Sequence, residues 1–571
     1  MDGAPPSMSD ARGLAADLAA LDEASLERVL RLRGVPESVA WRDFFDAAEG
    51  LLDEASIDRA LVRLPRSALA DLAHPVATGA RPALREHALA DAQGRPYRAV
   101  AARVHEHLRT APDAFRVEVA PAPALAAPLE EAAAAERAAL GIASLADVLL
   151  TMRTAPLART GTGAVAAADR RRLQESGLVA SADDLDELLE SAALAGLAAP
   201  VDREWLVTAA GDRWLHGSTA QRWSAVVEGI VASLPEGLRD ARGIHPPASW
   251  AAAYPLDPEW PARCIALRSI AVRWGLTDPN GAEHAWGTRL RATGTADTDA
   301  FAALLPPEID RIYLQADLSA IAPGPLAPAL DLRLRSMAVR ESRAQASTYR
   351  FSPESLATAV GAGETAESLR AFLSDLSLTG IPQPLDYLLE STAARHGLIR
   401  VQTDAGGTRV GSDDPQELAT LAVDQAVRAV GLVRDGDTLV SRVSRDAVYW
   451  TLVDARYPAI AVDATGEPEP LVRCRLAPAA PPEPRTHAQL LATLRETRGD
   501  DTDAAWLGRE LDAAVRARAM IVVVVAMPDG STREFTLEAT GLGGGRLRGR
   551  DRGADTERTL PVSHIVSARP A

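Results

Sequence analysis

The sequence contains no lysine, so all 61 of its cationic side chains are arginine. A P-loop ATPase needs a lysine against the β- and γ-phosphates of its nucleotide, and a pyridoxal enzyme needs one for its Schiff base. The absence of lysine therefore excludes both classes, and we expect that this chain is not an ATP-driven motor. Arginine in place of lysine, beside many alanines and glycines, is typical of high-GC bacterial codon usage.

Cysteine and aromatic residues are scarce as well. The two cysteines, Cys264 and Cys474, lie far apart without a CxxC pair, which excludes a cysteine zinc site and suits a reducing compartment. Aromatic residues make up 4% of the chain, which argues against a base-stacking surface for single strands. His245 and His284 show no metal-ligand spacing, so we expect neither a metal nor another cofactor.

Long apolar runs are missing too. The most apolar short run, Met520–Met527, is far below the about 20 residues that a membrane-spanning helix needs. The acidic N-terminus lacks the apolar core of a signal peptide. We therefore expect a soluble, cytoplasmic protein without a membrane partner.

No group of residues follows a catalytic pattern. His105 and His107 lack the i, i+4 spacing of a zinc protease, and no GxSxG motif is present. The glycine run Gly541–Gly545 lacks a following Lys-Ser/Thr, so it predicts a turn between strands instead of a phosphate-binding loop. We therefore expect no catalytic residue and no enzymatic activity.

The length predicts several domains, at about 150 residues each, and the patterns predict an α+β multidomain protein. Proline- and alanine-rich stretches at Ala120–Ala135 and Ala477–Pro484 predict linkers. The expected domains are a helical domain (1–119), a winged-helix-like domain (137–235), an irregular tryptophan-rich helical region (236–305), a small α/β domain (306–475) and a helix pair with a small β-rich domain (487–571).

Residues 137–235 have the order helix, helix, short strand, which is typical of a winged helix. Together with the helical domain expected at 1–119, this order predicts a mainly helical N-terminal half. In such folds the second helix of the pair usually enters the DNA major groove. Here the corresponding helix, Ala182–Leu197, carries carboxylates that would face phosphates with the wrong sign: Asp183, Asp184, Asp186, Glu187 and Glu190. This pattern favours a protein-contacting or scaffolding winged helix over a DNA reader.

The most informative stretch runs from Ile309 to Val401. A strand over 312–317, a helix over 326–340 and a second strand over 348–351 are predicted by their apolar patterns. Ser352 at the N-cap and a proline at the first helical position then open a further helix. The order of strands and helices predicts a small α/β unit.

The same stretch resembles a known family. The runs IYLQADLSAIAPGPL (312–326), YRFSPESLATAVGAGETAESLRAFL (349–373) and IPQPLDYLLE (381–390) are similar to the N-terminal domain of XPB-type helicases, found in bacterial proteins labelled helicase-associated. The resemblance implies a small α/β helicase-associated domain and a DNA-handling role. Because no Walker A lysine exists, it covers the accessory domain and not the motor.

The C-terminal end is rich in predicted strands, over 520–527, 533–538, 546–550 and 558–566. Asp-Gly between apolar runs at Pro528–Ser531 is a hairpin signal. This end resembles a WYL-type small β domain. The Trp-Tyr-Leu tripeptide of that family is absent, and Arg546-Leu547-Arg548 stands about where it would fall.

Arginines are concentrated in two regions of an acidic chain whose formal net charge is −17. Residues 516–552 hold seven arginines against four acidic residues, and residues 331–350 hold five against two. An acidic protein that binds nucleic acid must confine its basic surface, and the planar guanidinium suits phosphate. The predicted nucleic-acid-binding residues are Arg546, Arg548 and Arg550, which would share one face of a strand, and Arg333, Arg335 and Arg343. Arginine used simply as solubilising charge explains the same pattern.

These observations lead to one main hypothesis and two alternatives. The resemblance implies a non-motor, helicase-associated DNA-handling protein that acts with a separate XPB-like helicase in DNA repair. A winged-helix and WYL-type transcriptional regulator is the first alternative, and a protein-interaction scaffold without DNA contact is the second. The oligomeric state stays open.

Overall fold

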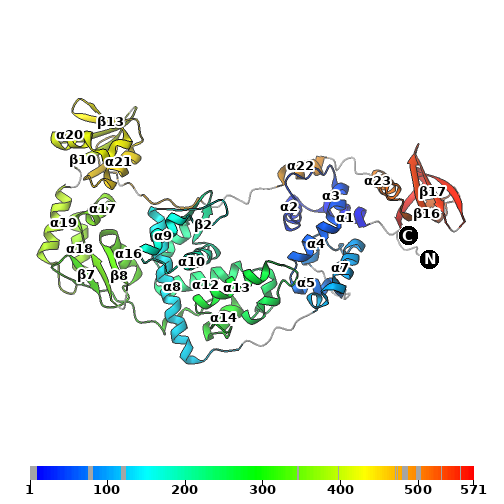
Figure 1. The fold of residues 1–571 in the computed structure, drawn as a ribbon, viewed down its shortest axis with the longest axis horizontal. Helices are drawn as coiled ribbons and strands as arrows, with labels where there is room; N and C mark the ends of the chain where they lie inside the picture. The colour runs from blue at the N-terminus through cyan, green and yellow to red at the C-terminus, as the bar shows by residue number, and fades with distance from the viewer. Residues whose placement is uncertain are drawn as a thin grey trace. The chain divides into compact units, whose positions relative to one another are not determined.

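The computed structural model describes residues 10–74, 82–116, 124–343, 346–395, 398–404, 406–469, 471, 473–478, 487–496, 503–528, 530–552 and 554–571. These residues form an α+β protein, as expected, with several small sheets (Figure 1). The chain divides into two compact units. Unit 1 comprises Met1–Ala122, Pro235–Ile265 and Pro481–Ala571, and unit 2 comprises Pro123–Leu234 and Ala266–Ala480. None of the described helices has the length and apolarity needed to cross a bilayer.

Unit 1 begins with a bundle of short helices. Its elements before the C-terminal sheet are α1 (Asp10–Ala20), α2 (Glu23–Leu32), α3 (Phe44–Leu52), α4 (Glu54–Arg63), α5 (Arg66–Ala73), α6 (Pro82–Glu86), α7 (Arg98–Thr110), the strand pair β4 (Arg239–Asp240) and β5 (Gly243–Ile244), α22 (Ala488–Glu496) and α23 (Asp503–Arg516). Leucines and phenylalanines from α1 to α7 form one core, and α22 adds three leucines to it although it follows almost 400 residues later.

Aspartates open three consecutive helices of this bundle. Asp22, Asp43 and Asp53 are the N-caps of α2, α3 and α4, and each carboxylate accepts a hydrogen bond from a backbone N–H of the first turn. Such caps satisfy donors that have no partner inside the helix and place negative charge at the positive end of its dipole. Several acids of the N-terminal segment therefore have a structural use.

A buried arginine directly after α2 joins α3, α4 and the residue that follows α6. Arg33 is 1% exposed, and its guanidinium donates to the carbonyl of Leu51 in the last turn of α3, to the carbonyl of His87 at 3.0 Å and to Ser56 Oγ at 2.9 Å. Burial lowers the pKa of Arg33 to about 10. Its acceptors are neutral oxygens, so the fork geometry, rather than a counter-charge, keeps this arginine in the core.

We predict that Arg33→Lys weakens the N-terminal bundle by about 3 kcal/mol, because an ammonium group cannot reach carbonyls on two helices and a hydroxyl at once. Hydrogen exchange of amides in α2, α3 and α4 measures the loss as faster local opening. The matched variant Arg59→Lys changes an exposed arginine of α4 and should alter exchange by less than about 0.5 kcal/mol. Equal exchange in both variants would contradict this role of Arg33.

The C-terminal part of unit 1 is a five-stranded antiparallel sheet with the order β18-β17-β16-β15-β19. Its strands are β15 (Met520–Ala526), β16 (Thr532–Gly543), β17 (Arg546–Asp551), β18 (Thr556–Pro561) and β19 (Ile565–Pro570). One face packs with α23 around Leu511, Val523 and Leu537. The single strand expected over 558–566 is wrong: Pro561 ends β18, and a 3-10 turn leads into β19.

Unit 2 begins with a helical region built on one long helix. Its elements are α8 (Pro128–Thr154), β1 (Leu157–Ala158), α9 (Ala167–Glu175), α10 (Ala182–Leu194), β2 (Ala198–Val201), β3 (Glu204–Val207), α11 (Ala209–Trp214), α12 (Thr219–Ser233), α13 (Trp260–Arg273, in this unit from Ala266), α14 (Ala285–Thr293) and α15 (Thr298–Ala302). Strands β1, β3 and β2 form a three-stranded antiparallel sheet in that order, and β2 lies against α10.

The start of α8 corrects the first predicted linker. Pro128 occupies the first turn of α8, and the alanine run that follows it is helical instead of extended. Proline is favoured at this position and alanine has the highest helix propensity, so both residue types support the helix. The rest of that predicted linker, up to residue 123, lies largely outside the described residues.

Tryptophans form the centre of this helical region. Trp223 stacks on Phe301 with ring centroids 4.1 Å apart, and Trp274 donates through Nε1 to Ser191 Oγ at 2.9 Å. Both tryptophans are fully buried. Each contact joins segments that are distant in sequence, so α10, α12, α13 and α15 share one core.

Residues 313–395 form the α/β part of unit 2 that the sequence predicts. The sheet has the order β6-β7-β9-β8, and helices α16 to α19 lie beside it (Figure 1). The elements are β6 (Tyr313–Leu314), β7 (Ser319–Ala322), α16 (Pro328–Met337), β8 (Val339–Arg343), β9 (Ser347–Arg350), α17 (Pro353–Gly361), α18 (Ala366–Leu376) and α19 (Gln383–Arg395).

Two local predictions in this part are wrong. The helix expected over 326–340 ends at Met337, and β8 follows at once. Of the strand expected over 312–317, only Tyr313–Leu314 forms a strand (β6). The chain then turns and pairs back as β7, which lies beyond the predicted range. The apolar pattern of α16 continues into β8, and the chain turns directly after β6. Periodicity alone reveals neither change.

The last part of unit 2 is a five-stranded sheet that mixes parallel and antiparallel strands. Its order is β12-β13-β11-β10-β14, in which only β10 and β14 run parallel. The elements are β10 (Ile399–Asp404), β11 (Gly407–Ser412), α20 (Pro415–Val423), β12 (Val433–Asp435), β13 (Thr438–Ser441), α21 (Arg445–Asp454) and β14 (Ala459–Val462).

Candidate functional site

The C-terminal sheet of unit 1 presents its arginines on the face away from α23. Along β17 exposed and buried residues alternate, so Arg546, Arg548 and Arg550 are exposed on one face while Leu547 and Gly549 are buried on the other. The predicted strand and the predicted common face of these three arginines are therefore confirmed. Figure 1 places β17 beside β16 in this sheet.

The strand register separates the three arginines into two environments. Arg550 lies between Glu538 of β16 and Glu557 of β18, and it donates to Asp555 at 2.7 Å. Arg548 lies between Gly541 and Thr559, and Arg546 between Gly543 and Pro561. Neither Arg546 nor Arg548 bonds through its side chain to any residue that the structure describes, so their guanidinium groups face solvent with all donors available.

Two acids of this sheet, Glu538 and Asp551, pair with other arginines. Glu538 accepts from Arg552 at 2.8 Å, and this hydrogen bond, followed by the charge of Arg552, lowers the pKa of Glu538. Asp551 accepts from Arg558 at 2.8 Å. The positive end of the sheet is therefore the end near the β16–β17 turn.

The arginines predicted in the α/β part of unit 2 have other surroundings. Arg333 on α16 pairs with Glu364 at 3.2 Å and covers the ring of Phe372 at 4.4 Å from its centroid. Arg335 points to Asp147 of α8, at 2.6 Å. Arg343 is the last residue of β8, and its side chain lies outside the described part of the chain.

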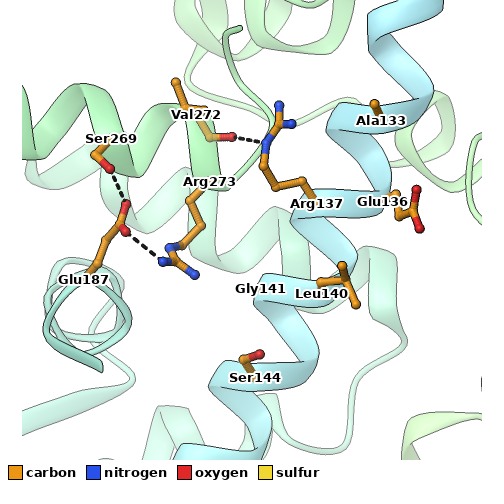
Figure 2. A pocket seen from close by; sticks show the side chains of 10 residues that line it. All are labelled: Ala133, Glu136, Arg137, Leu140, Gly141, Ser144, Glu187, Ser269, Val272 and Arg273. Carbon is orange, nitrogen blue, oxygen red and sulfur yellow. Dashed lines mark hydrogen bonds and ion pairs between the residues drawn. The ribbon is translucent and has the colours of Figure 1, made fainter. Parts of the chain in front are cut away.

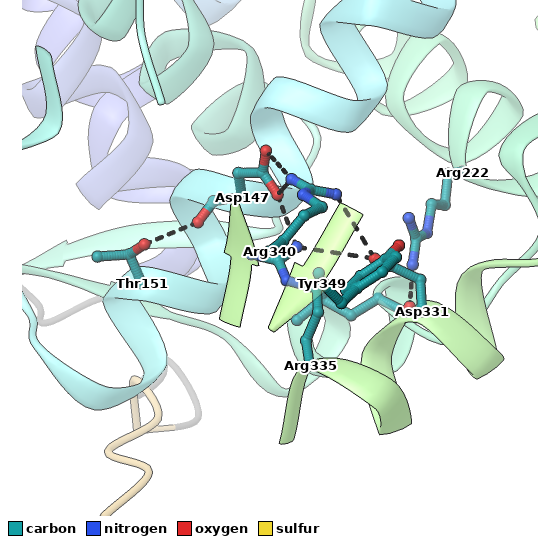
Figure 3. Close-up of polar contacts among 8 residues, drawn as sticks. Asp147, Thr151, Arg222, Asp331, Arg335, Arg340 and Tyr349 are labelled. Carbon is teal, nitrogen blue, oxygen red and sulfur yellow. Dashed lines mark hydrogen bonds and ion pairs between the residues drawn. The ribbon is translucent and has the colours of Figure 1, made fainter. Parts of the chain in front are cut away.

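Asp147 is the centre of a buried network that the sequence did not suggest (Figure 3). Its carboxylate is 3% exposed and accepts from Arg335 at 2.6 Å and from Arg340 of β8 at 2.5 Å. A second carboxylate, Asp331 of α16, lies 3.8 Å from Arg340 and accepts a 2.6 Å hydrogen bond from the Tyr349 hydroxyl. The network joins α8 to the α/β part, so these two regions of unit 2 are held together by charge as well as by apolar contact.

Burial determines the protonation behaviour of this network. Burial opposes the charge of Arg340, but Asp147 and Asp331 outweigh it and raise its pKa. Burial, followed by the charge of Asp331, raises the pKa of the Tyr349 phenol. The nearby Arg222, which donates to the carbonyl of Trp214 at 3.3 Å, has its pKa lowered by burial to about 10. Arg340 and Arg222 therefore stay cationic and Tyr349 stays neutral near neutral pH, so the network is a fixed structural contact between α8 and the α/β part.

The signal that would have pointed to Asp147 is its position in the sequence. It interrupts the apolar run Leu145–Met152 on the buried face of α8. A lone carboxylate in such a run must be paired to be buried at low cost. What the sequence does not reveal is the partner.

Three of the five carboxylates of α10 pair with arginines of unit 2. Asp186 forms two hydrogen bonds with Arg170 of α9, at 2.8 and 2.9 Å. Asp184 and Glu187 both accept from Arg273 of α13 at 2.7 Å. These pairs hold α10 against α9 and α13, and the expectation that this helix does not read DNA stays a prediction.

A cleft of about 460 Å³ lies between α8, α10 and α13 (Figure 2). Arg137 of α8 crosses it and donates to the carbonyl of Val272 at 3.1 Å, while Glu187 accepts from Ser269 Oγ at 2.9 Å. Its polar walls therefore bond largely to one another. We assign no ligand to this cleft.

The histidine His107 and the glycine run Gly541–Gly545, which the sequence analysis considered, have structural roles. His107 bonds to Asp58 at 2.8 Å, and Gly544 and Gly545 form the two-residue turn between β16 and β17 with φ of 58° and 70°. Left-handed φ at both positions is the requirement of a type I′ hairpin turn. In the part of the chain that the structure describes, no three His, Cys, Asp or Glu side chains come together as metal ligands.

Comparison with known proteins identifies one domain. Residues 312–435 match the family model described as the helicase conserved C-terminal domain. This stretch includes the α/β part of unit 2 and the first strands of the following sheet. It is a helicase-related domain, and it indicates a helicase-associated role connected with nucleic acid. A search of curated proteins gave no significant match.

We predict that Asp147→Asn destabilises the packing of α16 and β8 on α8 by about 3–5 kcal/mol, because two buried guanidinium groups lose their counter-charge. Hydrogen exchange of amides in α16 and β8 measures this loss. Asp186→Asn, at a carboxylate whose side chain is 49% exposed, is the matched control and should cost less than about 1 kcal/mol. Similar changes in both variants would show that the network does not join α8 to the α/β part.

Proposed function

We propose that this chain is a non-motor, helicase-associated protein that handles DNA and acts with a separate XPB-like helicase in DNA repair. The observation that carries the proposal is the helicase-related domain at 312–435 in a chain without a single lysine. A helicase-related domain indicates a role connected with nucleic acid. Because the chain has no lysine, an ATP-driven motor would have to be supplied by another protein. Co-purification of an XPB-type helicase with the tagged protein from its host tests the partner.

The DNA contact is assigned to the C-terminal sheet. Arg546 and Arg548 are exposed and bond to no carboxylate among the residues that the structure describes, and a guanidinium fork matches the oxygens of a phosphate. Arg333 and Arg335 contribute less to this proposal, because their guanidinium groups already contact Glu364 and Asp147. Arg343 stays a candidate on the sequence argument alone.

We expect the purified protein neither to bind nor to hydrolyse ATP, because the phosphates of a nucleotide would have no Walker A lysine to hold them. Titration calorimetry with ATP and Mg²⁺ should give no heat of binding. Stoichiometric binding, or hydrolysis that persists unchanged through repeated purification, would contradict the non-motor assignment.

The double variant Arg546→Ala/Arg548→Ala should weaken binding to duplex DNA and reduce the log–log salt slope by about 1.8, at about 0.9 per phosphate contact. Phosphate contacts carry no sequence information, so the loss should be the same for unrelated duplexes. Fluorescence anisotropy at graded salt concentrations measures both quantities.

Arg550→Ala is the matched control, because this arginine already pairs with Asp555 and stands between two glutamates. It should change the slope by less than half as much. A loss as large as that of the double variant would contradict the assignment to the turn end of β17. A strong preference of the wild type for one sequence favours the transcriptional regulator, and an absence of salt-dependent binding favours the scaffold.

A further inference from the structure

The free arginines of β17 stand beside two glycines that the fold does not require. In the run Gly541–Gly545, Gly544 and Gly545 have positive φ and are needed by the turn. Gly541 and Gly543 have φ outside the left-handed region, and a side chain at either position would meet no close neighbour: the nearest heavy atom to a Cβ on Gly541 is 4.0 Å away, and there is none within 4 Å at Gly543.

The bulge in β16 does not explain these glycines either. The register shifts between Ala539 and Gly541, and no residue at the shift has the positive φ that a glycine-type bulge needs. Glycine within a strand is less favourable than a residue with a side chain by about 0.5–1 kcal/mol. Gly549 on the buried face differs, because a Cβ there would lie 2.9 Å from the Leu537 Cβ and displace the core.

Gly541 and Gly543 lie on the same face as the free arginines. The atom that a Cβ on Gly541 would approach, at 4.0 Å, is the Cβ of Arg548, and Gly543 is the register partner of Arg546. The two guanidinium groups therefore rise from β17 next to a strip of β16 that consists of bare backbone. A glycine in a strand often marks the close approach of another backbone or a ligand.

We infer that the sugar–phosphate backbone of a nucleic acid lies against the sheet over Gly541 and Gly543, with its phosphates held by Arg546 and Arg548. This inference rests on the proposed function and specifies how the DNA approaches. The register places no aromatic side chain on this face along the described residues of β17 and β18 or beside them on β16. Bases are therefore not stacked here, and the recognised chemistry is the phosphodiester backbone of a duplex or a single strand.

The test introduces bulk without changing charge. In the full-length protein, Gly541→Val/Gly543→Val fills the strip with side chains that suit a strand, so the melting temperature should stay the same or rise. Affinity for a fluorescent DNA duplex of about 20 base pairs should fall about tenfold or more, since the backbone is held away from the arginines. Thr536→Val, on an exposed position of β16 outside the strip, is the control and should leave affinity unchanged.

The outcomes separate this inference from the proposed function. If the arginine double variant loses DNA binding while the glycine double variant retains it, the close approach is wrong and the proposed function stands. If wild-type protein binds no DNA, both fail. Equal losses in the glycine variant and in Thr536→Val overturn the inference, because the strip would then not be special. A single-stranded oligonucleotide of the same length shows which form of DNA lies on the strip. If the glycine double variant loses affinity for the duplex, for the single strand or for both, the inference is supported and the affected form is the one that binds there.

Discussion

The guanidinium group of arginine is the interaction on which this structure depends, because the chain has no other strong cation. Arginine forks repeatedly hold the carbonyls that helices leave unpaired at their C-terminal ends. Arg33 does so for α3, Arg495 donates to the carbonyl of Ala19 near the end of α1, and Arg222 donates to that of Leu215 directly after α11. Each contact uses several donors in a fixed plane, which an ammonium group would not reproduce.

This structural use of arginine limits where function can lie. In a chain of net charge −17, many of the described arginines are paired with carboxylates or carbonyls, among them Arg33, Arg333 and Arg335. The arginine-rich region of α16 and β8 is an example, since Arg335 and Arg340 neutralise Asp147 and join α8 to the helicase-related domain. A basic surface for a polyanion must therefore be built from arginines that bond to no carboxylate of the described residues, and two of these, Arg546 and Arg548, share one face of β17.

Local features of the fold were predictable from the sequence, while long-range pairing was not. Ser352 with Pro353 correctly marked the start of α17, and the alternation of Arg546, Arg548 and Arg550 correctly indicated one face of a strand. The glutamates beside Arg550 were not predictable, because they depend on the register of three strands. Asp147 finds its two arginines 188 and 193 residues further along the chain, a distance that no local pattern spans. Strand β8 was missed because the apolar periodicity of α16 continues into it.

We propose that nucleic acid binds at the turn end of the β16–β17 hairpin and that no other surface of the protein binds it with comparable affinity. Hydrogen exchange of the full-length protein, with and without a saturating DNA duplex at low salt, tests it most directly. The account predicts slower exchange in peptides that cover Gly541–Asp551 and unchanged exchange in α10 and α16. Protection of α10 or α16 with an unchanged hairpin would contradict it.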